Sequence, residues 1–372
     1  MVKAFKLYGI EYDDRDQEIC NFENVHETNF LPMHLRCVAH TTNLVATTDF
    51  KKILENSSFK AIHDSAFDKC SQIWLASRRP KTSEAIDKII EGNRRMIYPT
   101  PTRWNSVFDS VERLMEYEEK LNILLVETQT KKNEEPKRFT SIEIKYLKNY
   151  LLLFRPLAKG LDDLQSEKDN FYGDLLPTLF SMKLQLEILC APESLEIVTD
   201  AAKPLLQAFV KRFKNFFDFH EFVPAVKLAI VASISHPKYK LNWFRYSPEL
   251  KQIAKRIFEG EVSSHAITTT LSAPSTSSIL SIFETEHEEA NSVSNEINRY
   301  LVDPSKDINM LHAFPNIKKI FMKSNVAVCS SAPVERLFSF AGIINSSRRG
   351  ALSPKNFEEL VMLKANKTYA KR

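Results

Sequence analysis

Apolar residues recur at every third or fourth position through much of the chain, which is the spacing of one face of an α-helix. The spacing is clearest between residues 105 and 260, where IEIKYLKNYLLLFRPLAKGLDDLQ and DLLPTLFSMKLQLEILC each carry an apolar side. Residues 51–98 show it less regularly, and the prolines of YPTPTRWNS interrupt it. Pro156 and Pro177 are expected to bend or start helices. The pattern predicts a mainly α-helical protein.

A change of composition separates the helical region from the C-terminal part. The segment VSSHAITTTLSAPSTSS is rich in Ser and Thr and low in charge, which predicts a flexible linker. We therefore divide the chain into residues 1–104, an all-α region at 105–260, a linker at 261–296 and a last ordered unit at 297–367.

The last unit contains two short amphipathic helices. Each is preceded by a serine and has a proline in its first turn, at Ser331 with Pro333 and at Ser353 with Pro354. Two short helices cannot bury both of their apolar stripes on each other, so they need either the rest of the chain or a second copy of it. The stripe residues are Val334, Leu337, Phe338, Leu352, Phe357, Leu360, Val361 and Leu363.

Composition narrows the classes of function. The chain has 51 Lys and Arg against 47 Asp and Glu, a balance of only +4. Residues 311–372 hold 11 basic residues and 3 Glu, a local balance of +8, which suits a phosphate-rich partner or a solvated surface. The five Cys form no CxxC pair and indicate reduced thiols in the nucleus or cytosol.

Several common sites have no counterpart in the sequence. No apolar run approaches the ~20 residues of a membrane span. We find no Gly-rich phosphate loop and no GxSxG or HExxH motif. We therefore expect neither a membrane nor a small-molecule substrate as partner.

The segment HLRCVAH places His34, Cys37 and His40 three residues apart, so Cys37 and His40 would share one face of a helix. Structural zinc needs about four such ligands, and no second Cys or His pair completes the set. We therefore expect no metal here. The alternative is that Cys37 is a small buried hydrophobic residue and His40 a hydrogen-bonded core residue.

The segment TPTRWNS joins Arg103 to Trp104 after a Pro-rich turn. Such a pair can stack on an unpaired base while the guanidinium group contacts a phosphate. In the alternative, Trp104 anchors the following helix to the core. Glu335, in the first turn of its predicted helix, is stabilised there by the helix dipole by about 0.3–1 kcal/mol.

Three segments resemble hAT-superfamily DNA transposases and the cellular proteins derived from them. They are HLRCVAHTTNLV, TPTRWNSVFDSVERL and SSAPVERLFSFAGIINSSRRGALSPKNFEELVMLKAN. The resemblance implies a ribonuclease-H-like core, with a small α/β part, interrupted by a long all-α insertion. It also implies C-terminal dimerisation and a site of three carboxylates that holds two Mg²⁺ ions.

The resemblance also assigns roles to individual residues. Glu335 matches the third acid, and Cys37 and His40 match a Cys-x-x-His feature of the core. Arg103 and Trp104 match a segment that holds a flipped base, and Arg348 and Arg349 would join them in contacting nucleic acid. The two aspartates of the site would precede residue 1, so we expect Glu335 to be a remnant and Mg²⁺ to be needed only in a full-length active relative.

These observations predict a non-enzymatic, transposase-derived protein of the nucleus, a domesticated transposable element with an incomplete ribonuclease-H-like core. Its expected partners are a second copy of itself, through the C-terminal region, and DNA through a residual contact. The alternative is the C-terminal part of an active cut-and-paste DNA transposase whose start was misassigned.

Overall fold

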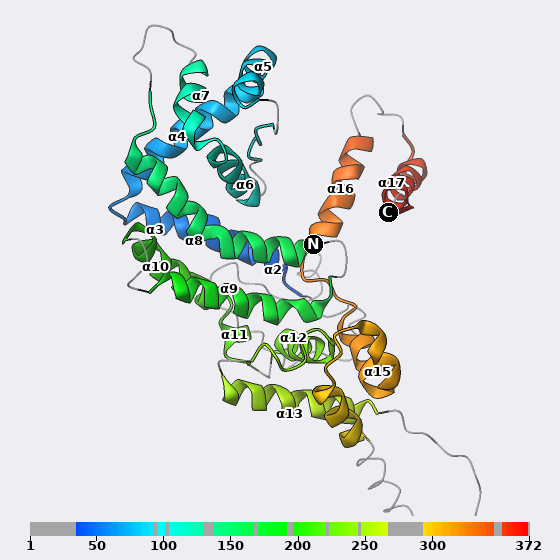
Figure 1. Cartoon of the computed structure of the whole chain (residues 1–372). Coiled ribbons are helices and arrows are strands. Elements are labelled where there is room, and N and C mark those ends of the chain that lie inside the picture. The colour runs from blue at the N-terminus through cyan, green and yellow to red at the C-terminus, as the bar shows by residue number, and fades with distance from the viewer. Residues whose placement is uncertain are drawn as a thin grey trace, which may run out of the picture. The chain divides into compact units, whose positions relative to one another are not determined.

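A computed structural model describes residues 35–91, 95–100, 104–128, 137–166, 170–191, 196–220, 223–244, 247–266, 293–345 and 352–370. Within these ranges the chain forms helices and no strand, so the mainly α-helical prediction is confirmed (Figure 1). Contacts join Cys37–Arg372 into one compact unit, which is the unit described below.

The elements follow one another with short connections. From the N-terminal side they are α2 (Val38–Leu44), the π-helical turn η1 (Val45–Asp49), α3 (Phe50–Glu55), α4 (Lys60–Ser77), α5 (Pro80–Ile89), α6 (Trp104–Met115), η2 (Glu118–Lys120), α7 (Leu121–Glu127), α8 (Ser141–Gln165), η3 (Tyr172–Asp174) and α9 (Leu175–Leu189). They continue with α10 (Glu196–Arg212), α11 (Lys214–Phe217), α12 (Pro224–Ser235), α13 (Pro248–Ser264), a helix at residues 293–302, η4 (Ile308–Ala313), α15 (Pro315–Ser324), α16 (Ala332–Ile344) and α17 (Pro354–Ala370).

Helix α8 packs against α4, α6, α9 and α10 and is the centre of the N-terminal half of the unit. It begins with a capping box, in which the Thr140 side chain accepts from the Glu143 N–H and the Glu143 carboxylate accepts from the Thr140 N–H. Pro156 lies inside this helix and does not end it. The carbonyl that Pro156 leaves without a helical partner belongs to Leu152, whose side chain is 43% exposed, so this side of the helix is open to water.

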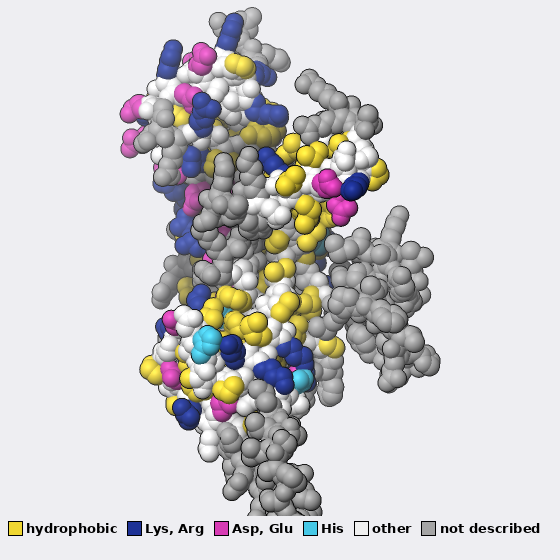
Figure 2. Space-filling model, turned by 90° about the vertical axis from the view of Figure 1, so that its right-hand side faces the viewer, with side chains coloured by type: hydrophobic (Ala, Val, Ile, Leu, Met, Phe, Trp, Pro, Cys, Tyr) yellow, Lys and Arg dark blue, Asp and Glu magenta, His cyan; other side chains and the backbone are white. Residues whose placement is uncertain are grey.

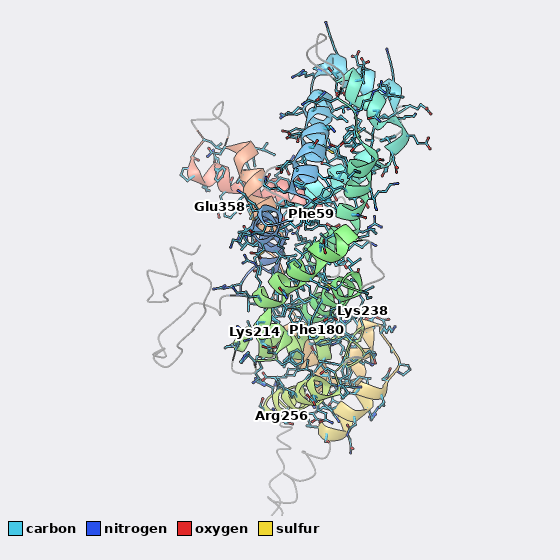
Figure 3. All side chains as sticks on the ribbon, turned by 90° about the vertical axis from the view of Figure 1, so that its left-hand side faces the viewer. Phe59, Phe180, Lys214, Lys238, Arg256 and Glu358 are labelled. Carbon is cyan, nitrogen blue, oxygen red and sulfur yellow. The ribbon has the colours of Figure 1, made fainter. Side chains whose placement is uncertain are left out.

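Aromatic rings fill the spaces between α8 and its neighbours. Phe50 of α3 meets Phe154 edge-on with ring centroids 4.7 Å apart, and Tyr150 lies 4.6 Å from Phe154. A second cluster forms around Phe180 of α9, whose ring lies 5.2 Å from that of Trp243; Phe180 is labelled in Figure 3. Phe180 and Trp243 thereby tie α9 to the turn that precedes α13.

Helix α12 packs against η3, α9, α13 and α15. Its sequence PAVKLAIVASIS is apolar on nearly all sides, as expected of a helix surrounded by others. Asn325, at the end of α15, accepts a hydrogen bond from the Gly173 N–H at 2.8 Å and donates to the Ala232 carbonyl at 3.3 Å. These buried bonds hold α15, η3 and α12 together.

One buried ion pair joins α4 to the start of α8. Both Glu143 carboxylate oxygens accept from Lys69 Nζ, at 2.5 and 2.6 Å, and the Ser65 hydroxyl donates to the same carboxylate at 2.6 Å. Burial by itself raises the pKa of Glu143, but the hydrogen bonds from Lys69 and Ser65 outweigh it and lower the pKa. The pair is therefore a charged link inside the protein.

Helices α16 and α17 pack against each other as a hairpin, which Figure 1 shows as two neighbouring ribbons. Ser331 precedes α16, and the Ser353 hydroxyl accepts from the Asn356 N–H at 3.3 Å where α17 begins. Both helix starts predicted from serine and proline are thus confirmed. The turn with Arg348 and Arg349 lies outside the described residues.

Candidate functional site

Helix α2 brings together the three segments that carry the resemblance. At its start, Cys37 contacts Ser330 and Ser331, which lie 293 and 294 residues further along the chain. Near its end, the Asn43 side-chain oxygen accepts a hydrogen bond from the Trp104 N–H at 3.2 Å. The segments are therefore neighbours in space as well as in the order expected from the resemblance. We call Cys37, Asn43, Trp104, Ser331 and Glu335 the junction.

The sulfur of Cys37 is surrounded by polar groups. The Ser331 N–H and hydroxyl both donate to it at 3.3 Å, and the His40 N–H donates at 3.4 Å. Cys37 precedes α2 and caps it, so the prediction that Cys37 and His40 share a helix face is wrong. The expected burial of both side chains is also wrong, since Cys37 is half-buried and the side chain of His40 is exposed.

Glu335 lies in the first turn of α16, as predicted, with its side chain exposed. Its carboxylate accepts a hydrogen bond from the Ser331 hydroxyl at 2.8 Å. The next residue, Arg336, donates to the Gln165 carbonyl at 3.2 Å and so links the start of α16 to the end of α8. Glu335 is thus held beside Cys37 through Ser331, in the position of a helix-start charge.

Trp104 is buried, with 6% of its surface exposed. Its ring lies 5.1 Å from Phe154 of α8 and 6.1 Å from Phe108 of its own helix, measured between centroids. This position matches the alternative in which Trp104 anchors α6 to the core, and it leaves no open face for stacking on a base. Arg103 lies outside the described residues.

Two carboxyl groups lie close to the junction, on α6 and α8. Burial and the charge of Asp162 raise the pKa of Asp109. Burial also raises the pKa of Asp162, against the opposing effect of the Asn105 side chain, which donates to it at 2.9 Å. Among the described residues no three His, Cys, Asp or Glu side chains are placed to hold a metal ion, and His34 lies outside those residues.

The predicted dimerisation residues divide between two faces of the hairpin. Leu337, Leu352, Phe357 and Leu360 are half-buried and Val361 is buried, as befits the seam between α16 and α17. Val334, Phe338 and Leu363 are 39%, 66% and 66% exposed.

Ile343 and Met362 belong to the same outer surface, with 68% and 52% of their area exposed. The sequence stripe did not single them out, because it follows one side of each helix while the open surface combines sides of both. We call Val334, Phe338, Ile343, Met362 and Leu363 the outer apolar face. Figure 2, which faces α15 to α17, shows hydrophobic side chains gathered there.

A group of lysines lies on the neighbouring helices α12, α13 and α15. Lys227 Nζ is 2.8 Å from the Glu261 carboxylate, and Lys323 Nζ is 3.5 Å from the other oxygen of that carboxylate. Lys323 also contacts the His265 ring at 2.6 Å, and Lys319 donates to the His265 carbonyl at 2.9 Å. Three ammonium groups thus share one carboxylate. Figure 2 shows Lys, Arg and His side chains below the apolar area.

Comparisons with known proteins leave the family open. No family model matches this sequence, and no curated protein matches it. The resemblance to hAT transposases therefore rests on the three segments quoted for it. In the described ranges, no helix is both long and apolar enough to cross a lipid bilayer.

Proposed function

We propose that this protein acts through self-association by the outer apolar face of its C-terminal hairpin, as a transposase-derived protein without a catalytic role for Glu335. The observation that carries the proposal is the exposure of Phe338, Ile343 and Leu363, each about two-thirds open on adjoining helices. Contiguous apolar surface of this kind marks protein contact sites. A second copy of the chain is the partner that the resemblance favours.

Light scattering after size exclusion tests the proposal. The unmodified chain is expected to run at twice the chain mass, and Phe338→Asp is expected to shift it to the monomer. Burying the exposed part of Phe338 contributes about 1.5 kcal/mol. A two-fold interface uses the residue twice, so about 3 kcal/mol, or more than 100-fold in Kd, is lost. A monomeric unmodified chain at micromolar concentration would sink the proposal.

Ile123→Asp is the matched control, because Ile123 of α7 is 57% exposed and lies outside the hairpin. This variant is expected to keep the mass of the unmodified chain. Glu335→Gln is also expected to keep it. A Mg²⁺-dependent DNA cleavage that is lost in Glu335→Gln would favour the alternative, the C-terminal part of an active transposase.

The lysine group supports a second element of the proposal, a contact with the nucleic-acid backbone. Lys319 and Lys323 have exposed side chains with one partly shared carboxylate between them, so a phosphate would add the missing negative charge. This surface is open, whereas the ring of Trp104 is buried. A nuclear location follows from this role and belongs to the same proposal.

Binding of a labelled DNA duplex, measured by fluorescence anisotropy at several salt concentrations, tests this contact. Lys319→Glu with Lys323→Glu is expected to weaken binding and to reduce the salt slope by about 2, since each lost phosphate contact changes it by about 0.9. Lys51→Glu with Lys52→Glu makes the same charge change on exposed residues of α3 and should bind much more tightly than the first pair. Equal loss in both pairs would show that only net charge matters.

A further inference from the structure

The two cysteines at the base of the hairpin lie next to each other, although they are far apart in the sequence. The Val38 N–H, directly after Cys37, donates to the Cys329 carbonyl at 3.2 Å. Each cysteine Cα lies about 2.4 Å from the nearer atom of this hydrogen bond, by standard bond lengths. The two Cα atoms are therefore separated by one hydrogen bond and less than two peptide units. Disulfides span Cα separations of about 4.4–6.8 Å, which is the range that this arrangement approaches.

Both sulfurs have polar neighbours in the present state. Cys329 Sγ donates to the Phe171 carbonyl at 3.5 Å, and Cys37 Sγ receives donors from Ser331. Each sulfur is thus held by a weak contact that a rotation about Cα–Cβ exchanges for the other sulfur. Both side chains are free thiols in this structure.

The two thiols differ in access. Cys37 is half-buried, so a small oxidant can reach its sulfur, and hydrogen-bond donors surround that sulfur as they do in reactive cysteines. Cys329 is 2% exposed. Burial, then the charge of Asp174 and that of Cys37, raise the pKa of the Cys329 thiol. Cys37 is therefore the group that reacts first, and Cys329 is the neighbour that resolves the product.

We propose that Cys37 and Cys329 form an oxidisable pair, in which a peroxide converts the two thiols into an intramolecular disulfide. In the first step the Cys37 sulfur attacks one peroxide oxygen, the O–O bond breaks, and sulfenic acid and water form. In the second step the Cys329 sulfur attacks the sulfenic sulfur, the S–O bond breaks, and the released hydroxide takes the Cys329 proton as a second water. Two thiols and one hydrogen peroxide thus give one disulfide and two waters.

The disulfide would act on the place where the hairpin leaves the rest of the unit. Cys329 lies three residues before α16, and the Cys37 sulfur now accepts from the N–H and hydroxyl of Ser331 at the start of that helix. Oxidation would replace these weak bonds by a covalent link between α2 and the segment leading to α16. The proposal rests on the cysteine geometry and does not depend on self-association.

Thiol counting on the full chain tests the pair. The protein is treated with a small excess of hydrogen peroxide, unfolded in N-ethylmaleimide, and weighed intact by mass spectrometry. The reduced chain should carry five adducts, one per cysteine, and the oxidised chain three. Tryptic mapping of the oxidised chain should give a cross-linked peptide containing Cys37 and Cys329, and a non-reducing gel should show one chain per molecule.

Single variants identify the two partners. Cys37→Ser and Cys329→Ser should each keep all four remaining thiols after peroxide, whereas the control Cys190→Ser should still lose two. The peptide map of the unmodified chain decides the question even where Cys329→Ser fails to fold. Five adducts after peroxide, a gain of one or two oxygen atoms without loss of a second thiol, or a cross-link between other cysteines would each overturn the proposal.

Discussion

Replacing Lys69 by Met would leave the Glu143 carboxylate inside the protein without its cation. The two side chains are 12% and 7% exposed, and the lysine nitrogen lies 2.5 Å from the carboxylate. Breaking a buried pair by removing one partner costs about 3–5 kcal/mol, because the remaining charge stays buried and unpaired. Ser65 and the Thr140 N–H still donate to the carboxylate, so we expect a loss near 3 kcal/mol.

Urea unfolding followed by far-UV circular dichroism measures this loss. With a slope of about 3 kcal/mol per molar, the unfolding midpoint should fall by about 1 M. Lys60→Met is the matched control, because Lys60 forms an ion pair with Asp64 on the same helix, with side chains 47% and 54% exposed. Exposed pairs of this kind contribute about 0.5 kcal/mol or less.

The pH dependence gives the prediction a second signature. In the unmodified chain the pKa of Glu143 is lowered by its partners, so its contribution to stability is present above the ordinary value of 4.5 and is lost as pH falls below it. Without Lys69, burial prevails and raises the pKa, so acid neutralises the carboxyl and relieves the penalty. The gap between the two proteins should be wide at pH 7 and narrow below pH 4.5. A loss equal to that of Lys60→Met, or one independent of pH, would refute the reasoning.

Two further predictions concern α4 and the contact between α8 and α9. Burial lowers the pKa of His63 to about 4 from 6.5, so its contribution to stability is complete above 6.5 and is lost as pH falls towards 4. We expect His63→Gln to remove about 1.5 kcal/mol of this acid sensitivity, half of the full value because the ring is partly exposed, as measured by urea midpoints from pH 7 to 4. Gly160→Ala would place its new carbon 1.9 Å from the Met182 methyl and should cost about 1–3 kcal/mol, while Gly260→Ala meets nothing within 4 Å and should gain about 0.5–1 kcal/mol. Urea midpoints that shift the same way in both glycine variants would contradict the role of α8–α9 contact.

The sequence predicted local features well because local chemistry determines them. A serine followed by a proline in the first turn was sufficient to place the starts of α16 and α17. The apolar spacing predicted the helices from residue 105 to residue 260 in the same way. Pro156 departed from expectation because its free carbonyl faces the open side of α8, where water replaces the missing hydrogen bond.

Contacts between distant segments could not be predicted from spacing. Cys37 was assigned to a helix face, but its sulfur instead accepts from Ser331, and this partner is invisible to any local pattern. Whether Trp104 was exposed or buried depended on Phe154, which belongs to α8. Ile343 and Met362 were missed because two helices together form the outer apolar face.

The contact between Cys37 and Ser330 also has a consequence for synthesis of the chain. The two residues are 293 positions apart, and ribosomes add about 5–20 residues per second, so about 15–60 s separate their appearance. During that time α2 has neither Ser331 beside its first residue nor the Cys329 carbonyl to accept from its first N–H. The beginning of the described unit is therefore among the last parts to be completed, and a nascent chain paused before residue 329 presents an unfinished α2 to the chaperones of the cell.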